Sequence, residues 1–112
     1  MASFQIAASL LDAIVLSVVA RAGTEGTYGY RITQDVRQVM DVSESTLYPV
    51  LRRLQKNGYL TAYDQECAGR NRRYYRLTGA GDTQLTDYLI EWRDYRDRVE
   101  TVFFGGQTNE QS

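Results

Sequence analysis

The sequence predicts a mainly α-helical fold with one small β-hairpin, and three successive stretches carry that prediction. Residues 41–58 place apolar side chains at helical spacing behind a polar start. Residues 59–77 resemble two strands around a glycine-containing turn. Residues 79–104 form a long, charged, periodic segment that favours a second extended helix. A short helix followed at once by a basic-tipped hairpin is the outline of a winged helix-turn-helix, here with a long C-terminal helix.

The helix expected within residues 41–58 has an apolar face and recognisable ends. Ser43 is a suitable N-cap, because its hydroxyl can accept from a backbone N–H in the first turn. Gly58 suits the C-terminal end, where a left-handed conformation is common. Pro49 lies inside the segment and removes a backbone donor, which leaves the first residue of the helix open. The apolar face at i, i+3, i+4 and i+7 consists of Leu47, Val50, Leu51 and Leu54.

The hairpin is expected to have strands near residues 59–64 and 72–77, joined by a turn that contains Ala68, Gly69, Arg70 and Asn71. Upstream, residues 28–40 carry Ile32, Val36 and Val39 at helical spacing, with polar residues between them. This segment predicts the first helix of the helix-turn-helix, and the link at Asp41 and Val42 is short enough for its turn.

Residues 6–22 are apolar on nearly every side, which predicts a helix buried in the domain or shared with a second subunit. Its β-branched residues also allow a strand, but the length favours a helix. Residues 23–27 have the composition of a loop.

The C-terminal helix is expected to begin after Thr78 as its N-cap, with Asp82 near its positive end. Its apolar residues repeat every 3.5 residues, a spacing typical of a helix that packs along another helix. They are Leu85, Trp92 and Val99 at one position and Tyr88, Tyr95 and Val102 at the other. This seam predicts a homodimer built from this helix and the first one. A single helix folded back over its own domain is the alternative.

The expected organisation is therefore a DNA-binding domain over residues 1–78, with its first helix shared with the dimer interface. A dimerisation helix over residues 79–104 and a disordered tail over residues 105–112 follow.

Composition excludes several classes of function. The chain has 112 residues, one cysteine and no histidine, so histidine-based catalysis and histidine metal sites are excluded. Cys67 has no thiol partner; a redox role next to the arginines and a spectator role both fit. No phosphate-binding glycine loop is present. We expect no enzyme, no cofactor and no metal. The apolar run of residues 13–20 is too short to cross a bilayer, and we expect a cytoplasmic protein.

Net charge is −1, but its distribution favours a nucleic-acid partner. Residues 43–77 hold seven basic and three acidic side chains, whereas the rest holds six basic and eleven acidic ones. Binding to phosphate depends on local basic patches. A merely solvated face explains Arg52 and Arg53 equally well, but it explains the cluster Arg70, Arg72 and Arg73 at the turn less well.

We therefore predict that the helix within residues 41–58 enters the major groove of double-stranded DNA. The predicted base or phosphate contacts near the helix start are Ser43, Glu44, Ser45, Thr46 and Tyr48. The predicted phosphate contacts are Arg52, Lys56, Arg70, Arg72 and Arg73. A two-fold dimer predicts a pseudo-palindromic operator with half-sites about one helical turn apart. A protein-interaction module that does not read DNA is the alternative, although it requires an apolar start to the helix.

The same residues resemble the PadR family of bacterial transcriptional regulators over roughly residues 11–104. The resemblance lies in residues 45–54 (STLYPVLRRL), Gly58, Gly69-Arg70, residues 73–78 (RYYRLT) and Tyr28-Gly29-Tyr30. Pro49 resembles a family feature. The resemblance implies a winged-helix regulator, for which we expect a repressor, and operator affinity that responds to small aromatic molecules at the dimer interface. Trp92 matches a position where some members stack planar ligands, and Tyr88 and Tyr95 could join such a site. A buried anchor of the dimer interface explains Trp92 equally well.

Overall fold

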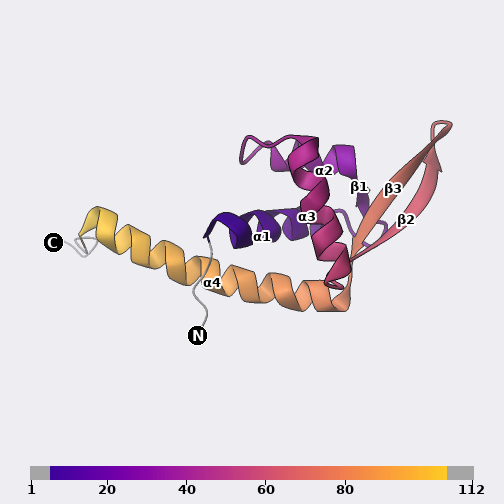
Figure 1. Cartoon of the computed structure of the whole chain (residues 1–112). Helices are drawn as coiled ribbons and strands as arrows, with labels where there is room; N and C mark the ends of the chain where they lie inside the picture. Colours follow the sequence, from indigo (N-terminus) through magenta and orange to yellow (C-terminus); the bar gives the residue numbers. More distant parts are fainter. Residues whose placement is uncertain (1–5, 106–112) are drawn as a thin grey trace.

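The computed structural model describes residues 6–105, apart from the side chains of residues 6–8 and 67. It consists of four helices and a three-stranded antiparallel sheet (Figure 1). In chain order the elements are α1 (Ile6–Arg21), β1 (Thr27–Tyr28), α2 (Gly29–Val36), α3 (Glu44–Lys56), β2 (Leu60–Cys67), β3 (Arg70–Leu77) and α4 (Gly79–Phe104). The expected mainly helical fold with a hairpin and a long C-terminal helix is confirmed. No helix in the described part of the chain is long and apolar enough to cross a membrane.

The core forms around α1, which contacts α2, α3, β3 and α4. Its apolar residues point in several directions, and burial of this surface by four different elements removes it from water. The expected apolar face of α3 lies against it and is buried throughout. The buried apolar residues are Ala13, Val15, Leu16, Val19, Ile32, Val36, Leu47, Val50, Leu51, Leu54, Leu60, Tyr75 and Leu85.

The hairpin is longer and its turn tighter than expected. Strands β2 and β3 pair from Leu60 opposite Leu77 to Cys67 opposite Arg70, so only Ala68 and Gly69 form the turn. Both have positive φ, 55° and 78°, the conformation that two-residue hairpins require to match the twist of the strands. Arg70, expected in the turn, therefore belongs to a strand. Strand β1 joins the last residue of the expected loop, Thr27, to the first residue of the expected helix, Tyr28, and pairs with β3 on the other side.

Helix α2 is shorter than the expected residues 28–40. The carbonyl of Val36 accepts from the N–H groups of both Val39 and Met40, which closes the helix into a turn. Val39 consequently leaves the apolar face and is 67% exposed, so its prediction as a core residue is wrong. The link between α2 and α3 runs from residue 37 to residue 43.

Helix α3 begins directly after Ser43, the expected N-cap, so its start, which Pro49 had left open, lies before the proline. The Ser43 hydroxyl accepts from the N–H of Thr46 at 3.3 Å, which satisfies one donor of the first turn. The helix continues through Pro49. Pro49 and Ser45, the residue whose carbonyl an N–H at position 49 would meet, are both exposed to solvent. The proline is therefore tolerated inside the helix.

Helix α4 is capped by Thr78, which accepts from the N–H of Gly81 at 2.9 Å and donates to the carbonyl of Gly58 at 2.6 Å. Its first half packs on α1, and its second half extends away from the other elements (Figure 1). The radius of gyration of 16.6 Å exceeds the roughly 13 Å of a compact domain of this length because of that extension. Gly105 ends the helix; the remainder of the expected tail lies outside the described residues.

A partly buried ion pair joins α1 to α3. The Asp12 side chain on α1 is 10% exposed and the Arg53 side chain on α3 is 46% exposed, and the Asp12 carboxylate accepts a hydrogen bond from the Arg53 guanidinium. Tyr88 of α4 lies close enough for Asp12 and Tyr88 to shift each other's pKa. Arg53 is thus occupied within the fold, and a purely solvated role for it is wrong. Burial raises the pKa of Asp12 above its ordinary value of 3.8, although Arg53 acts in the opposite direction.

This ion pair predicts how stability depends on pH. Because the folded state holds the Asp12 proton more tightly than the unfolded chain, ionisation of Asp12 lowers stability as pH rises above 3.8 through the raised folded pKa. Asp12→Asn removes this contribution. The free energy of unfolding of the wild type, measured relative to that of Asp12→Asn by urea titration, should therefore fall as the pH rises above the ordinary Asp12 pKa of 3.8. A difference that rises with pH would contradict this assignment, and Asp87→Asn on the exposed face of α4 is the matched control.

Candidate nucleic-acid interface

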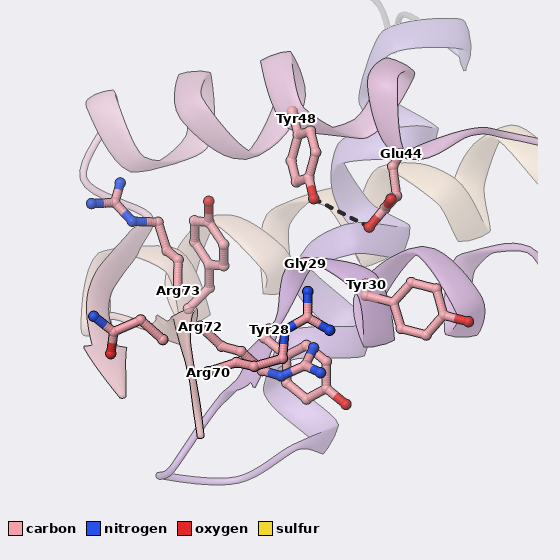
Figure 2. A pocket seen from close by; sticks show the side chains of 10 residues that line it. Tyr28, Gly29, Tyr30, Glu44, Tyr48, Arg70, Arg72 and Arg73 are labelled. Carbon is pink, nitrogen blue, oxygen red and sulfur yellow. Dashed lines mark hydrogen bonds between the residues drawn. The ribbon is translucent and has the colours of Figure 1, made fainter. Parts of the chain in front are cut away.

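A groove of about 450 Å³ lies between the start of α3 and the wing formed by β2 and β3 (Figure 2). One side is built by the N-terminal turns of α2 and α3, and the other by the first residues of β3. Three arginines and one carboxylate line it, so its charge is positive overall. The lining residues are Tyr28, Gly29, Tyr30, Glu44, Tyr48, Arg70, Asn71, Arg72, Arg73 and Tyr75.

Of the three arginines in the groove, Arg72 is held in place by the stacking of its guanidinium on Tyr28. Its guanidinium carbon lies 4.5 Å from the centroid of the Tyr28 ring, a cation–π distance. Its Nε is buried and has no hydrogen-bond partner in the described structure. The stack on Tyr28 restricts the Arg72 side chain before any ligand arrives. The terminal N–H groups of the guanidinium can still donate hydrogen bonds to a ligand. Arg72 is therefore a preorganised cation at the groove.

Arg73 differs from Arg72 because it has a nearby acidic neighbour. Its Nε lies 3.6 Å from Oδ1 of Asp64 on β2, and both side chains are largely exposed. An exposed pair of this kind contributes little to stability and exchanges readily with other partners. Arg73 can therefore turn toward an external anion at low cost.

Glu44 and Tyr48 form the other side of the groove. The Tyr48 hydroxyl donates to Oε2 of Glu44 at 3.1 Å, one turn apart on α3 (Figure 2). Partial desolvation, reinforced by this hydrogen bond, raises the pKa of Tyr48 above its ordinary value of 10.0. The hydroxyl therefore keeps its proton at neutral pH. The Tyr48 ring also packs on Gly29, where a Cβ would lie 2.9 Å from the ring carbon Cε1.

The hydroxyls at the start of α3 lie beside the groove rather than in its lining. Ser43 Oγ lies 2.9 Å from Ser45 Oγ and 3.1 Å from Thr46 Oγ1, and all three side chains are exposed. Arg52 and Lys56 are exposed farther along α3, also outside the groove.

Half of the predicted DNA-contacting residues thus come together in one groove: Glu44, Tyr48, Arg70, Arg72 and Arg73. Their contact with DNA stays a prediction. Sequence reasoning missed Tyr28, Tyr30 and Asn71 as lining residues. The Tyr28-Gly29-Tyr30 motif was the available signal, because β1 places it beside β3.

A second hollow of about 520 Å³ lies where α4 faces α1 and the end of α2. Trp92 and Leu89 of α4 line it together with apolar residues of α1 such as Ile14 and Val18. Tyr95 is next to Trp92, with ring centroids 6.4 Å apart, but it is not in the lining. Tyr88 turns toward Asp12 instead. The structure therefore does not bring all three predicted ligand contacts together.

Known proteins share both the sequence pattern and this architecture. Residues 15–87 match the model of the transcriptional regulator PadR-like family. The chain is 38% identical to transcriptional regulator Rv3488 of Mycobacterium tuberculosis over 98 residues, which cover 87% of this chain and 88% of the relative.

Among solved structures, smu.1704 from Streptococcus mutans is similar with a TM-score of 0.80, 36% identity and 93% coverage of both chains. A PadR family transcription regulator from Clostridium difficile is similar with a TM-score of 0.71 and 28% identity, covering 84% of this chain and 97% of that one. The winged-helix fold with a long C-terminal helix is common to this group. The chain belongs to the PadR-like family of transcriptional regulators.

Proposed function

We propose that this protein is a sequence-specific DNA-binding repressor that acts as a homodimer in the cytoplasm. The observation that carries the proposal is the groove between the start of α3 and the wing, where three arginines lie opposite polar side chains of α3. Arginines supply phosphate contacts that set the register of a protein on DNA, while helix side chains reach base edges in the major groove.

The polar start of α3 also supports DNA binding over the second class of function considered from the sequence, a protein-interaction module. A protein-interaction module requires an apolar surface there, whereas Ser43, Ser45 and Thr46 present exposed hydroxyls. The small net charge of −1 does not oppose DNA binding, because the basic side chains are concentrated in residues 43–77. No observation in the described part of the chain favours the interaction module.

Dimerisation through α4 is the second part of the proposal. The helix carries large apolar side chains that its own domain leaves exposed, with Val102 at 78% and Phe103 at 72%. Leu89, Ile90 and Phe104 extend this surface. A second copy of the chain would bury it and would place two α3 helices on one duplex, which implies a pseudo-palindromic operator.

The dimer predicts a specific response to charge on α4. Val102→Glu combined with Phe103→Glu should shift the protein from dimer to monomer in sedimentation equilibrium, since both residues are exposed in the isolated chain. Thr101→Glu on the same helix is the control and should leave the dimer intact. A dimer that persists at micromolar concentration in the double variant would argue against this interface.

The third part of the proposal is that a planar aromatic effector binds beside Trp92. The hollow of about 520 Å³ lies within the size range of small-molecule sites and combines apolar side chains with Arg21 and Asp35. A flat aromatic molecule could stack on the indole there. The occupied dimer would differ in how α4 sits against α1, and the operator affinity would change with it.

The chain contains one tryptophan, so the effector can be followed without labelling. Titration with planar aromatic molecules should quench Trp92 fluorescence and change the operator affinity at the same concentrations. Tyr28→Phe, remote from this hollow, should keep the response. Absence of quenching across a panel of planar aromatics, with operator affinity unchanged, would remove the effector from the proposal.

The DNA interface predicts the salt dependence of binding. Arg72→Ala combined with Arg73→Ala should weaken binding to all sequences alike and reduce the slope of log K against log salt by about 2. Fluorescence anisotropy with labelled DNA from upstream of the protein's own gene, and with scrambled DNA of equal length, measures both effects. Arg93→Ala combined with Arg96→Ala on α4 is the matched control with the same loss of charge.

The wild type should bind the upstream DNA more than about tenfold more tightly than the scrambled DNA if the operator lies there. An unchanged salt slope in the wing variant would refute the wing assignment. Equal and weak binding of the wild type to both DNAs would direct attention to a distant operator or to the interaction module.

A further inference from the structure

Glu44 is an acidic side chain at a surface otherwise suited to phosphate. It lines the groove together with Arg70, Arg72 and Arg73, yet it forms no ion pair with them in the described structure. Its carboxylate instead accepts a hydrogen bond from the Tyr48 hydroxyl at 3.1 Å. Tyr48 itself is 40% exposed and presents the pair toward the groove (Figure 2).

A carboxylate in this place opposes binding to any duplex, because it repels the phosphates that the arginines attract. Its position as the first residue of α3 offers one compensation, since negative charge stabilises the N-terminal end of a helix. Ser43 already caps that helix, however. The dipole also requires no particular orientation of the carboxylate. The hydrogen bond from Tyr48 fixes such an orientation.

The edges of the bases indicate what an oriented carboxylate can recognise. In the major groove guanine offers only acceptors and thymine offers an acceptor and a methyl group, so both repel or ignore a carboxylate. Adenine offers an amino donor next to the acceptor N7, which repels the second oxygen. Cytosine offers the N4 amino group with no neighbouring acceptor on the same base. An ionised glutamate therefore accepts best from cytosine.

We infer that Glu44 is a specificity-determining residue whose carboxylate accepts a hydrogen bond from the N4 amino group of a cytosine in each operator half-site, with Tyr48 as its positioning residue. This inference rests on the proposed function, because it names the base that the same interface reads. It assigns discrimination to Glu44 and affinity to the wing arginines. The negative charge weakens binding to every DNA sequence, and the hydrogen bond to N4 offsets this loss of affinity only where cytosine is present.

The inference predicts a change of base rather than only a loss of binding. Selection of duplexes from a randomised DNA library should recover a motif for the wild type with cytosine fixed at one position of each half-site. Glu44→Gln should change that position to adenine, because glutamine pairs in bidentate fashion with N6 and N7 of adenine. The other positions of the motif should remain as they are. On matched duplexes the preference between the two bases should reverse by about tenfold or more.

Two further variants separate this role from charge and from helix stability. Asp41→Asn removes one negative charge outside the groove, at an exposed residue, and should strengthen binding to all duplexes without altering the motif. Tyr48→Phe removes the hydroxyl that orients Glu44 and should weaken the preference for cytosine while leaving the salt slope unchanged. Thermal unfolding of Glu44→Gln, compared with that of the wild type, measures how much Glu44 contributes to the stability of the start of α3.

The outcomes distinguish this inference from the proposed function. If the wild type enriches a motif and Glu44→Gln enriches the same bases at every position, the inference is wrong and the proposed function stands. If the wild type enriches no motif at all, the sequence-specific function fails and the inference fails with it. A motif that changes at the Glu44-dependent position alone supports both.

Discussion

Burial of α1 is the constraint on which the rest of the structure depends. This helix is apolar on nearly all sides, so no single partner can cover it, and α2, α3, β3 and α4 each pack on a different part of its surface. The Asp12–Arg53 ion pair fixes α3 relative to α1 at one further point. A residue change within α1 therefore acts on α3 and on α4 together. The central helix links the two surfaces that the proposed function uses.

The groove depends on this arrangement because its two sides come from separate parts of the chain, residues 28–48 and residues 70–75. Packing on α1 holds the start of α3, while the short pairing of β1 with β3 places Tyr28 beneath Arg72. The residues that line the groove therefore belong to helices and strands rather than to a free loop. Only the ends of their side chains remain free to move. Such a scaffold lowers the cost of ordering arginines on binding. The remaining freedom lies in Arg73, whose exposed partner Asp64 can be exchanged for phosphate.

Local patterns in the sequence determine much of this fold, but long-range pairing does not follow from them. The face of α3 and the caps Ser43 and Thr78 were predictable, because each depends on residues within one turn. The end of α2 was not, since Val39 continues the apolar period while the backbone has already turned. Strand β1 has only two residues and exists through its pairing with Tyr74 and Tyr75. The groove residues Tyr28 and Tyr30 were missed for the same reason, and Arg53 was separated from Asp12 by forty-one positions.

The proposed function requires that the groove between α3 and the wing receives DNA, and mapping the contact surface in solution tests this requirement most directly. Amide resonances of ¹⁵N-labelled protein would be followed during titration with a short duplex at low salt. If the groove receives DNA, the largest shifts fall on residues 28–30, 43–48 and 70–73, and α4 is unaffected beyond its first turn. Shifts confined to α4, or to the link between α2 and α3, would contradict it and place any nucleic-acid contact on another face.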